Sequence, residues 1–129
     1  MKRQLILGLS LVLPALLGGC GPTTEEKVQN LFQSASDWED EDNYDAAIKD
    51  YSEAIKLKPD YHWAWINRGL VYHKKGDYDA AIKDHSEAIK LEPENYKAWA
   101  LRGYAYEEIG NTVKAQADLK KAKELGFNP

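Results

Sequence analysis

The chain has 129 residues, of which 43% are hydrophobic and 29% charged, and its net charge at pH 7 is −4. This acidic balance argues against a nucleic-acid-binding protein, because such proteins gather basic residues against the phosphates. A single cysteine excludes a disulfide within the chain.

The N-terminal segment has the pattern of a secretory signal. Lys2 and Arg3 precede an apolar stretch over residues 5–17, and the sequence LGGC follows at 17–20. Thirteen residues are too few for a membrane-spanning helix, which needs about 20. We therefore predict a signal peptide over residues 1–19.

The tetrad LGGC resembles the lipobox of bacterial lipoproteins. This resemblance implies that Cys20 is acylated and becomes the mature N-terminus, and that residues 20–27 form the lipidated cysteine and a short tether. Two or three acyl chains hold a protein firmly at a membrane. The expected location is the cell envelope, and Gly21 in place of a retaining aspartate favours the outer membrane or outer surface. An ordinary signal peptide with a coincidental cysteine is the alternative.

A long stretch of sequence then occurs twice. DAAIKDYSEAIKLKP (45–59) returns as DAAIKDHSEAIKLEP (79–93), with 13 of 15 residues identical and an offset of 34, and a weaker third copy covers 111–129. A fixed period of this size is typical of a repeat architecture. The period divides the chain into three units, 28–61, 62–95 and 96–129, of which the first is the most degenerate.

The spacing within a unit predicts two helices. Large side chains at the fourth and eleventh positions flank a small one at the eighth, which places all three on one helical face. Small residues recur at three positions of every unit, in the order of the units: Ala35, Gly69 and Gly103; Ala47, Ala81 and Ala115; Ala54, Ala88 and Ala122. Glycine and a capping residue separate the two helices, and Pro59 and Pro93 end the second one. We therefore expect an all-α fold of three tandem helix–turn–helix units.

These positions resemble the tetratricopeptide repeat, most strongly in AWINRGLVYHKKGDYDAAIKDHSEAIKLEP (64–93). The resemblance covers residues 28–129 and implies a short right-handed solenoid with a concave groove lined by the first helices of the units. Members of this family bind proteins or peptides in that groove. The sequence departs from the family at Arg68 and Arg102, which replace a leucine, and at Phe127, which replaces a closing proline.

The two arginines suggest structural ion pairs. An arginine at a normally apolar position needs a partner for its charge, and an aspartate stands at the twenty-third position of every unit: Asp50, Asp84 and Asp118. We predict that each arginine pairs with an aspartate of its own or the preceding unit. An arginine acting as a hook for a ligand is the alternative.

Residues that the scaffold does not require are candidates for a binding groove. Positions two, five, nine and twelve share a helical face, which carries Trp63, Ile66, Leu70 and Tyr104. Their alternative role is packing between helices. The carboxylate clamp by which some family members bind C-terminal tails is matched only at Asn67 and Lys97, so recognition of a chaperone tail is not expected.

The sequence gives no pattern for catalysis. His62, His73 and His85 lack the spacing of a zinc site, and neither a phosphate-binding loop nor a nucleophile–base set is present. We expect neither enzyme activity, nor a metal, nor a cofactor. The sequence favours a membrane-tethered adaptor that binds a protein or peptide. A homo-oligomerising module and a non-catalytic glycan or peptidoglycan binder are the alternatives.

The lipid anchor is directly testable, because Cys20 is the only cysteine. In Cys20→Ala, we expect metabolic labelling with a fatty acid to disappear and the protein to remain unprocessed or be released. Label that persists on the variant would exclude lipidation at this residue.

Overall fold

The computed structural model describes residue 19 and residues 21–129. The predicted signal peptide and Cys20 lie outside the described residues, apart from Gly19. Within this part, the chain forms six α-helices: α1 (Thr24–Asp40), α2 (Tyr44–Leu57), α3 (His62–Lys75), α4 (Tyr78–Leu91), α5 (Tyr96–Glu108) and α6 (Thr112–Glu124).

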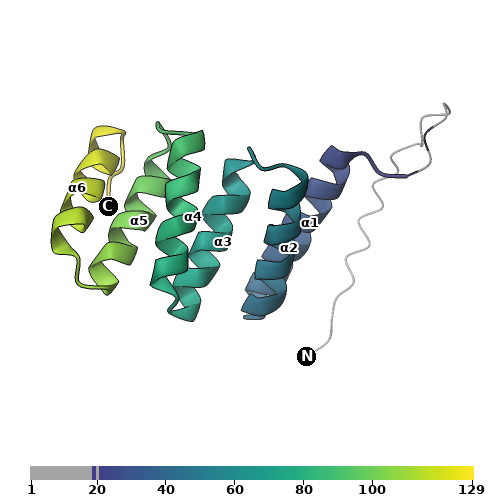
Figure 1. The fold of residues 1–129 in the computed structure, drawn as a ribbon, viewed down its shortest axis with the longest axis horizontal. Coiled ribbons are helices and arrows are strands. Elements are labelled where there is room, and N and C mark those ends of the chain that lie inside the picture. The colour runs from purple at the N-terminus through teal and green to yellow at the C-terminus, as the bar shows by residue number, and fades with distance from the viewer. Residues whose placement is uncertain (1–18, 20) are drawn as a thin grey trace.

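The helices are stacked in chain order as three antiparallel pairs, α1–α2, α3–α4 and α5–α6 (Figure 1). Each pair packs against the next through α2 and α3 or through α4 and α5. The described part contains no strand. This arrangement confirms the all-α repeat fold that the 34-residue period predicts.

Small residues hold the two helices of a pair close together. All six alanines at the twentieth and twenty-seventh positions are fully buried. A Cβ atom on Gly69 would lie only 2.7 Å from Cε1 of His85, and one on Gly103 would lie 3.0 Å from Cγ of Leu119. A larger side chain at these places would separate the helices, since native cores leave no room for additional atoms.

The turns between paired helices explain another recurring feature. Gly76 and Gly110 have φ angles of 81° and 77°, and Asp42 occupies the same place in the first unit with φ of 56°. Asp42 is the one non-glycine residue with positive φ among those described. The residue that follows each of them caps the next helix: the side chains of Asn43, Asp77 and Asn111 accept hydrogen bonds from backbone N–H groups.

Side chains also tie neighbouring units together. The indole Nε1 of Trp65 donates a hydrogen bond of 2.8 Å to the carbonyl of Pro59, and Trp99 makes the same bond with Pro93. These bonds cross from one unit to the next, which gives a physical reason for the recurrence of both tryptophan and proline.

Phe127 has a different function from the prolines that it replaces. Gly126 takes φ of 108° after α6, and the N–H of Phe127 donates to the carbonyl of Ala122. This geometry, a common helix C-terminus, places the Phe127 ring 6.0 Å from the ring of Tyr96 and 6.4 Å from that of Tyr104. Phe127 therefore covers part of the face of α5 that carries Tyr96 and Tyr104.

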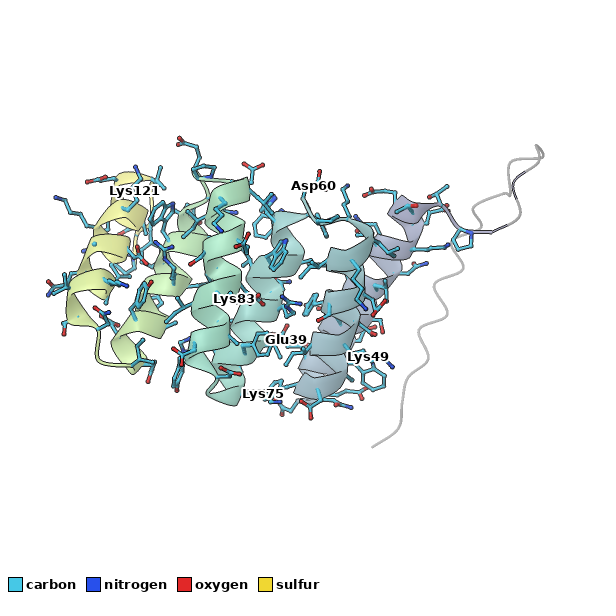
Figure 2. The ribbon with its side chains drawn as sticks, in the orientation of Figure 1. Glu39, Lys49, Asp60, Lys75, Lys83 and Lys121 are labelled. Carbon is cyan, nitrogen blue, oxygen red and sulfur yellow. The ribbon has the colours of Figure 1, made fainter. Side chains whose placement is uncertain are left out.

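The N-terminal end of the stack begins earlier than expected. Helix α1 starts at Thr24, with a capping box between Thr23 and Glu26, so residues 24–27 of the predicted tether are helical. None of the described helices is long and apolar enough to cross a membrane. Charged side chains such as Lys49 on α2 and Lys83 on α4 project from the surface (Figure 2).

The close helix packing predicts the effect of added volume. Ala81 on α4 is fully buried, so Ala81→Leu should lower the free energy of unfolding by about 1–3 kcal/mol through overpacking. Urea unfolding followed by circular dichroism measures this change. Ala117→Leu is the matched control, because Ala117 is exposed on α6 and its replacement should change stability little. Equal stability of the two variants would show that α3 and α4 do not pack so closely.

Candidate functional site

The predicted groove residues lie on α3 and α5, and the structure brings only some of them together. Nζ of Lys97 on α5 lies 5.4 Å from the centre of the Trp63 ring on α3, which is a cation–π contact. Tyr104 is 37% exposed and packs edge-on against Phe127. Leu70 is partly buried. The contact between Trp63 and Lys97 is therefore the centre of the candidate site.

The assignment of Ile66 to the groove is wrong. Ile66 is only 3% exposed and forms a core cluster with Ala88, Ile89 and Ala98. Ile66 thus packs between its partner helix α4 and the next helix α5. Ala100, at the same position of the third unit, is equally buried. Asn67 also has a structural contact, since its amide donates to the hydroxyl of Tyr51 on α2 at 3.4 Å.

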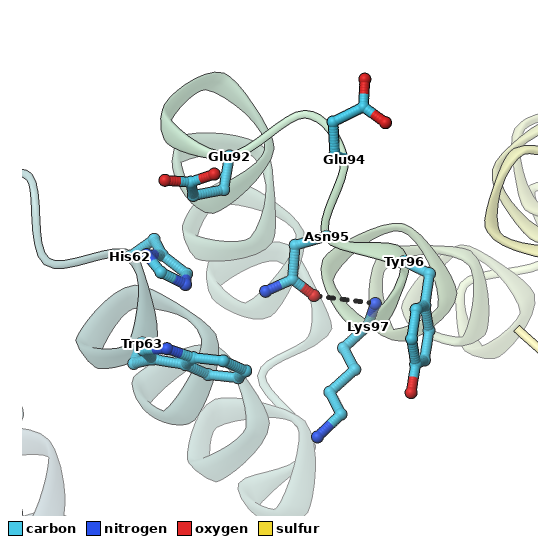
Figure 3. A pocket seen from close by; sticks show the side chains of 7 residues that line it. All are labelled: His62, Trp63, Glu92, Glu94, Asn95, Tyr96 and Lys97. Atoms are coloured by element: carbon cyan, nitrogen blue, oxygen red, sulfur yellow. Dashed lines mark hydrogen bonds between the residues drawn. The ribbon is translucent and has the colours of Figure 1, made fainter. Parts of the chain in front are cut away.

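A pocket opens where the second and third units meet. It has a volume of about 530 Å³ and is lined by residues from the start of α3, the α4–α5 turn and the start of α5. In Figure 3 the aromatic rings of Trp63 and Tyr96 flank it, with Glu92 and Glu94 above them. The complete lining is His62, Trp63, Glu92, Glu94, Asn95, Tyr96 and Lys97.

Local structure fixes several of these side chains. Asn95 caps α5, because its Oδ1 accepts a hydrogen bond of 3.1 Å from the backbone N–H of Lys97 (Figure 3). The His62 ring lies 4.9 Å from the Trp63 ring. Neither Glu92 nor Glu94 makes a side-chain hydrogen bond or an ion pair with any described residue. The pocket thus combines aromatic surface with two carboxylates that have no partner in the described chain.

The first junction between units lacks these features although its scaffold is nearly the same. Where the second junction has Asn95, the first has Tyr61, whose ring packs edge-on against Phe32 at 5.4 Å. Where the second has Glu92, the first has Lys58, which pairs with Glu25 at 2.8 Å. The differences between units at positions 31 and 34 therefore point to Glu92 and Asn95 as pocket residues. The pattern of the first helices does not predict them, because both residues lie in the turn before α5.

The two arginines form partly buried ion pairs within their own units. Arg68 Nε lies 2.7 Å from Asp84 and Nη2 2.8 Å, which is a bidentate contact. Arg102 contacts Asp118 in the same manner, at 2.7 and 2.9 Å. Burial raises the pKa of the Asp84 carboxyl, and the guanidinium of Arg68 opposes this change.

Each arginine also reaches back to the preceding unit. Nη1 of Arg68 donates to Ser52 at 2.9 Å, and Nη1 of Arg102 donates to Ser86 at 3.1 Å. Asp50 has no such arginine, because the first unit has Ser34 at that position; Ser34 donates to Asp50 at 2.6 Å. The pairs join helices and units, so these arginines are not placed to contact a ligand in the pocket.

His85 is the most unusual buried group. It is fully buried, and neither of its ring nitrogens has a hydrogen-bond partner in the described chain. Tyr51, one unit earlier, has two partners: its hydroxyl donates to Glu39 and accepts from Asn67. The corresponding residues one unit later are His73 and Leu101, and neither forms a hydrogen bond with His85. Burial, followed by the charges of His73 and Arg102, lowers the pKa of His85 to about 3.

In the part of the chain that the structure describes, no cluster of three or more His, Cys, Asp or Glu side chains could hold a metal ion. The pocket itself presents aromatic faces, an imidazole, two carboxylates, an amide and one ammonium group.

Family models match the chain over most of the stack. A model described as Tetratricopeptide repeat matches residues 62–95, another of the same description matches 86–117, and one described as TPR repeat matches 40–76. The chain is a tetratricopeptide repeat protein.

Solved structures of similar fold include several proteins of this kind. MamA is 32% identical with a TM-score of 0.74, over 76% of this chain and 57% of MamA, so the chain spans little more than half of that protein. The second TPR of Spaghetti (RPAP3), solved bound to the HSP90 peptide SRMEEVD, is 27% identical with a TM-score of 0.75, over 79% of this chain and 96% of that one. The Arabidopsis OM64 TPR domain is 25% identical with a TM-score of 0.77, over 81% of this chain and 86% of that domain.

The unpartnered His85 predicts acid sensitivity. Its pKa is lower in the folded chain than the usual value of about 6.5 in an unfolded one. The unfolded state therefore binds more protons than the folded state below about pH 6.5. As the pH is lowered, this group decreases the free energy of unfolding by up to about 1.4 kcal/mol per pH unit. Leucine occupies the equivalent place in the third unit (Leu119), so His85→Leu should remove this slope. Urea unfolding at pH 7, 6 and 5 compares His85→Leu with the unchanged chain. If the free energy of unfolding falls equally in both, His85 is not the cause of the acid sensitivity.

Proposed function

We propose that this chain is a tethered adaptor of the bacterial cell envelope, which binds a segment of a partner protein at the pocket between the second and third units. The tether is the lipid on Cys20 that the lipobox resemblance implies. The role is binding and not catalysis, and the partner is a protein or peptide.

The observation that carries the proposal is the open pocket around Trp63. Trp63 is half-buried: it packs against the core cluster around Ile66 and also lines the open pocket. Trp63 stands at the second position, where the other units have Gln29 and Lys97. Tryptophan and tyrosine contribute disproportionately to binding energy at protein interfaces.

The related structures support binding of a peptide by this fold. The second TPR of Spaghetti was solved with a bound peptide. That peptide is acidic at its C-terminus, whereas the pocket of this chain carries two carboxylates and one lysine. We therefore expect this chain to bind a peptide segment as well, but one of different charge from the HSP90 peptide.

A substitution taken from the chain itself tests the proposal. Asn95→Tyr introduces the residue of the first junction and should fill the pocket as Tyr61 fills its own surroundings. Loss of the Asn95 cap costs about 1 kcal/mol, and α3 begins after Tyr61 without a side-chain cap, so the fold should persist. We expect the variant to lose the partner that is cross-linked to the full-length protein in its native envelope.

Trp63→Ala should have the same result, since truncation of a central tryptophan typically costs about 2 kcal/mol of binding energy. Leu57→Ala is the control, because Leu57 is 42% exposed on α2 and lies outside the pocket. Retention of the partner by Asn95→Tyr would refute binding at this pocket. Concentration-dependent sedimentation that Asn95→Tyr abolishes would instead identify self-association through the pocket. Binding to purified sacculi that Asn95→Tyr abolishes would identify glycan binding.

A further inference from the structure

The fold itself shows how it holds a guanidinium group. The guanidinium carbon of Arg68 lies 5.1 Å from the centre of the Trp65 ring and 5.9 Å from that of Tyr72, while Asp84 accepts two of its hydrogen bonds. Arg102 has the same surroundings, with Trp99 at 5.1 Å, Tyr106 at 5.8 Å and the carboxylate of Asp118. Each site consists of two aromatic rings, a carboxylate and the hydroxyl of a serine, Ser52 or Ser86.

The pocket between the second and third units has two of these components, aromatic rings and carboxylates, without a guanidinium. Trp63 and Tyr96 provide aromatic rings, and Glu92 and Glu94 provide carboxylates that pair with no described cation. The Trp63 ring already accepts a cation, since the ammonium of Lys97 lies 5.4 Å from its centre. The same ring face can hold a guanidinium in place of this ammonium.

We propose that the pocket binds the guanidinium of an arginine side chain from the partner segment. The inference rests on the proposed function and specifies its ligand. The guanidinium would stack on Trp63 or Tyr96 and pair with Glu92 or Glu94, and Lys97 would turn aside. Lys97 is exposed on a flexible stem, so this movement needs no change in the backbone.

The pocket chemistry favours arginine over other groups. A guanidinium is planar and weakly hydrated, so it stacks on aromatic rings and binds carboxylates in two-point contacts that an ammonium cannot make. The lining contains two carboxylates against one lysine, and the whole chain carries a net charge of −4. An acidic side chain would meet repulsion from both glutamates.

A minimal peptide tests the chemistry separately from the natural partner. The probe is an acetylated and amidated Gly/Ser heptapeptide with one central arginine, titrated into the full-length protein in detergent micelles. The readout is the NMR signal of the Trp63 indole N–H, assigned by its loss in Trp63→Phe. Peptides with citrulline, lysine or glutamate in place of arginine are the controls, because citrulline keeps the shape of arginine and lacks its charge.

The charge variants give effects of opposite sign. We expect the arginine peptide to shift the Trp63 signal and the citrulline and glutamate peptides to leave it unchanged. Glu92→Gln combined with Glu94→Gln should weaken binding about tenfold, whereas Lys97→Gln should strengthen it by a factor of about 2–3. The ionic strength is kept low and constant, since salt screens exposed charges.

Three results would overturn the inference: no response to arginine, binding of the glutamate peptide that depends on Lys97, or equal binding of the citrulline peptide. If the arginine peptide fails while Asn95→Tyr still abolishes partner capture, the pocket binds a partner by other chemistry and the proposed function stands. If the arginine peptide binds but Asn95→Tyr leaves partner capture intact, the pocket binds guanidinium groups and the proposed binding of the partner at this pocket fails.

Discussion

The distance at which two helices can pack is the constraint on which the whole stack depends. The paired helices approach so closely that a single added Cβ on Gly69 would contact the His85 ring at 2.7 Å. Buried alanines at two positions of every second helix meet the same requirement. These positions tolerate little variation in volume, so small residues recur there in every unit. This constraint accounts for the alanines that residues 45–59 and 79–93 share, Ala47 with Ala81 and Ala54 with Ala88.

Differences between such similar units are therefore informative about function. The second helices of the first two units have almost the same sequence, and the exchange of Tyr61 for Asn95 and of Lys58 for Glu92 occurs just after them. At the first junction these residues close the surface with an aromatic contact and an ion pair. At the second they leave a pocket lined by Trp63 and Tyr96. A repeat can thus acquire a pocket through changes in a turn, without alteration of its core.

The sequence predicted the fold well because small residues and turn glycines recur with a fixed period. It also indicated a pairing of arginine with aspartate, since Arg68 and Arg102 each require a partner for a charge at a normally apolar position. It failed for Ile66, because periodicity along one helix does not reveal which neighbouring helix covers a given face. The orphaned ring of His85 was equally hidden, as its cause is the replacement of Asn67 by Leu101 on a helix of the next unit.

The hydrogen bonds that cross unit boundaries have a consequence for how the molecule unfolds. The second unit donates hydrogen bonds to the first through Trp65 and Arg68. The third unit donates hydrogen bonds to the second through Trp99 and Arg102. In a linear array of repeats, the free energy of unfolding is approximately the sum of two contributions: the low intrinsic stability of each unit and the favourable interaction between neighbouring units. The middle helix pair takes part in both couplings, so its loss leaves two isolated pairs that cannot bury their apolar faces. Because hydrogen bonds cross both boundaries, we expect the array to melt as one cooperative block and not by successive loss of units from its ends.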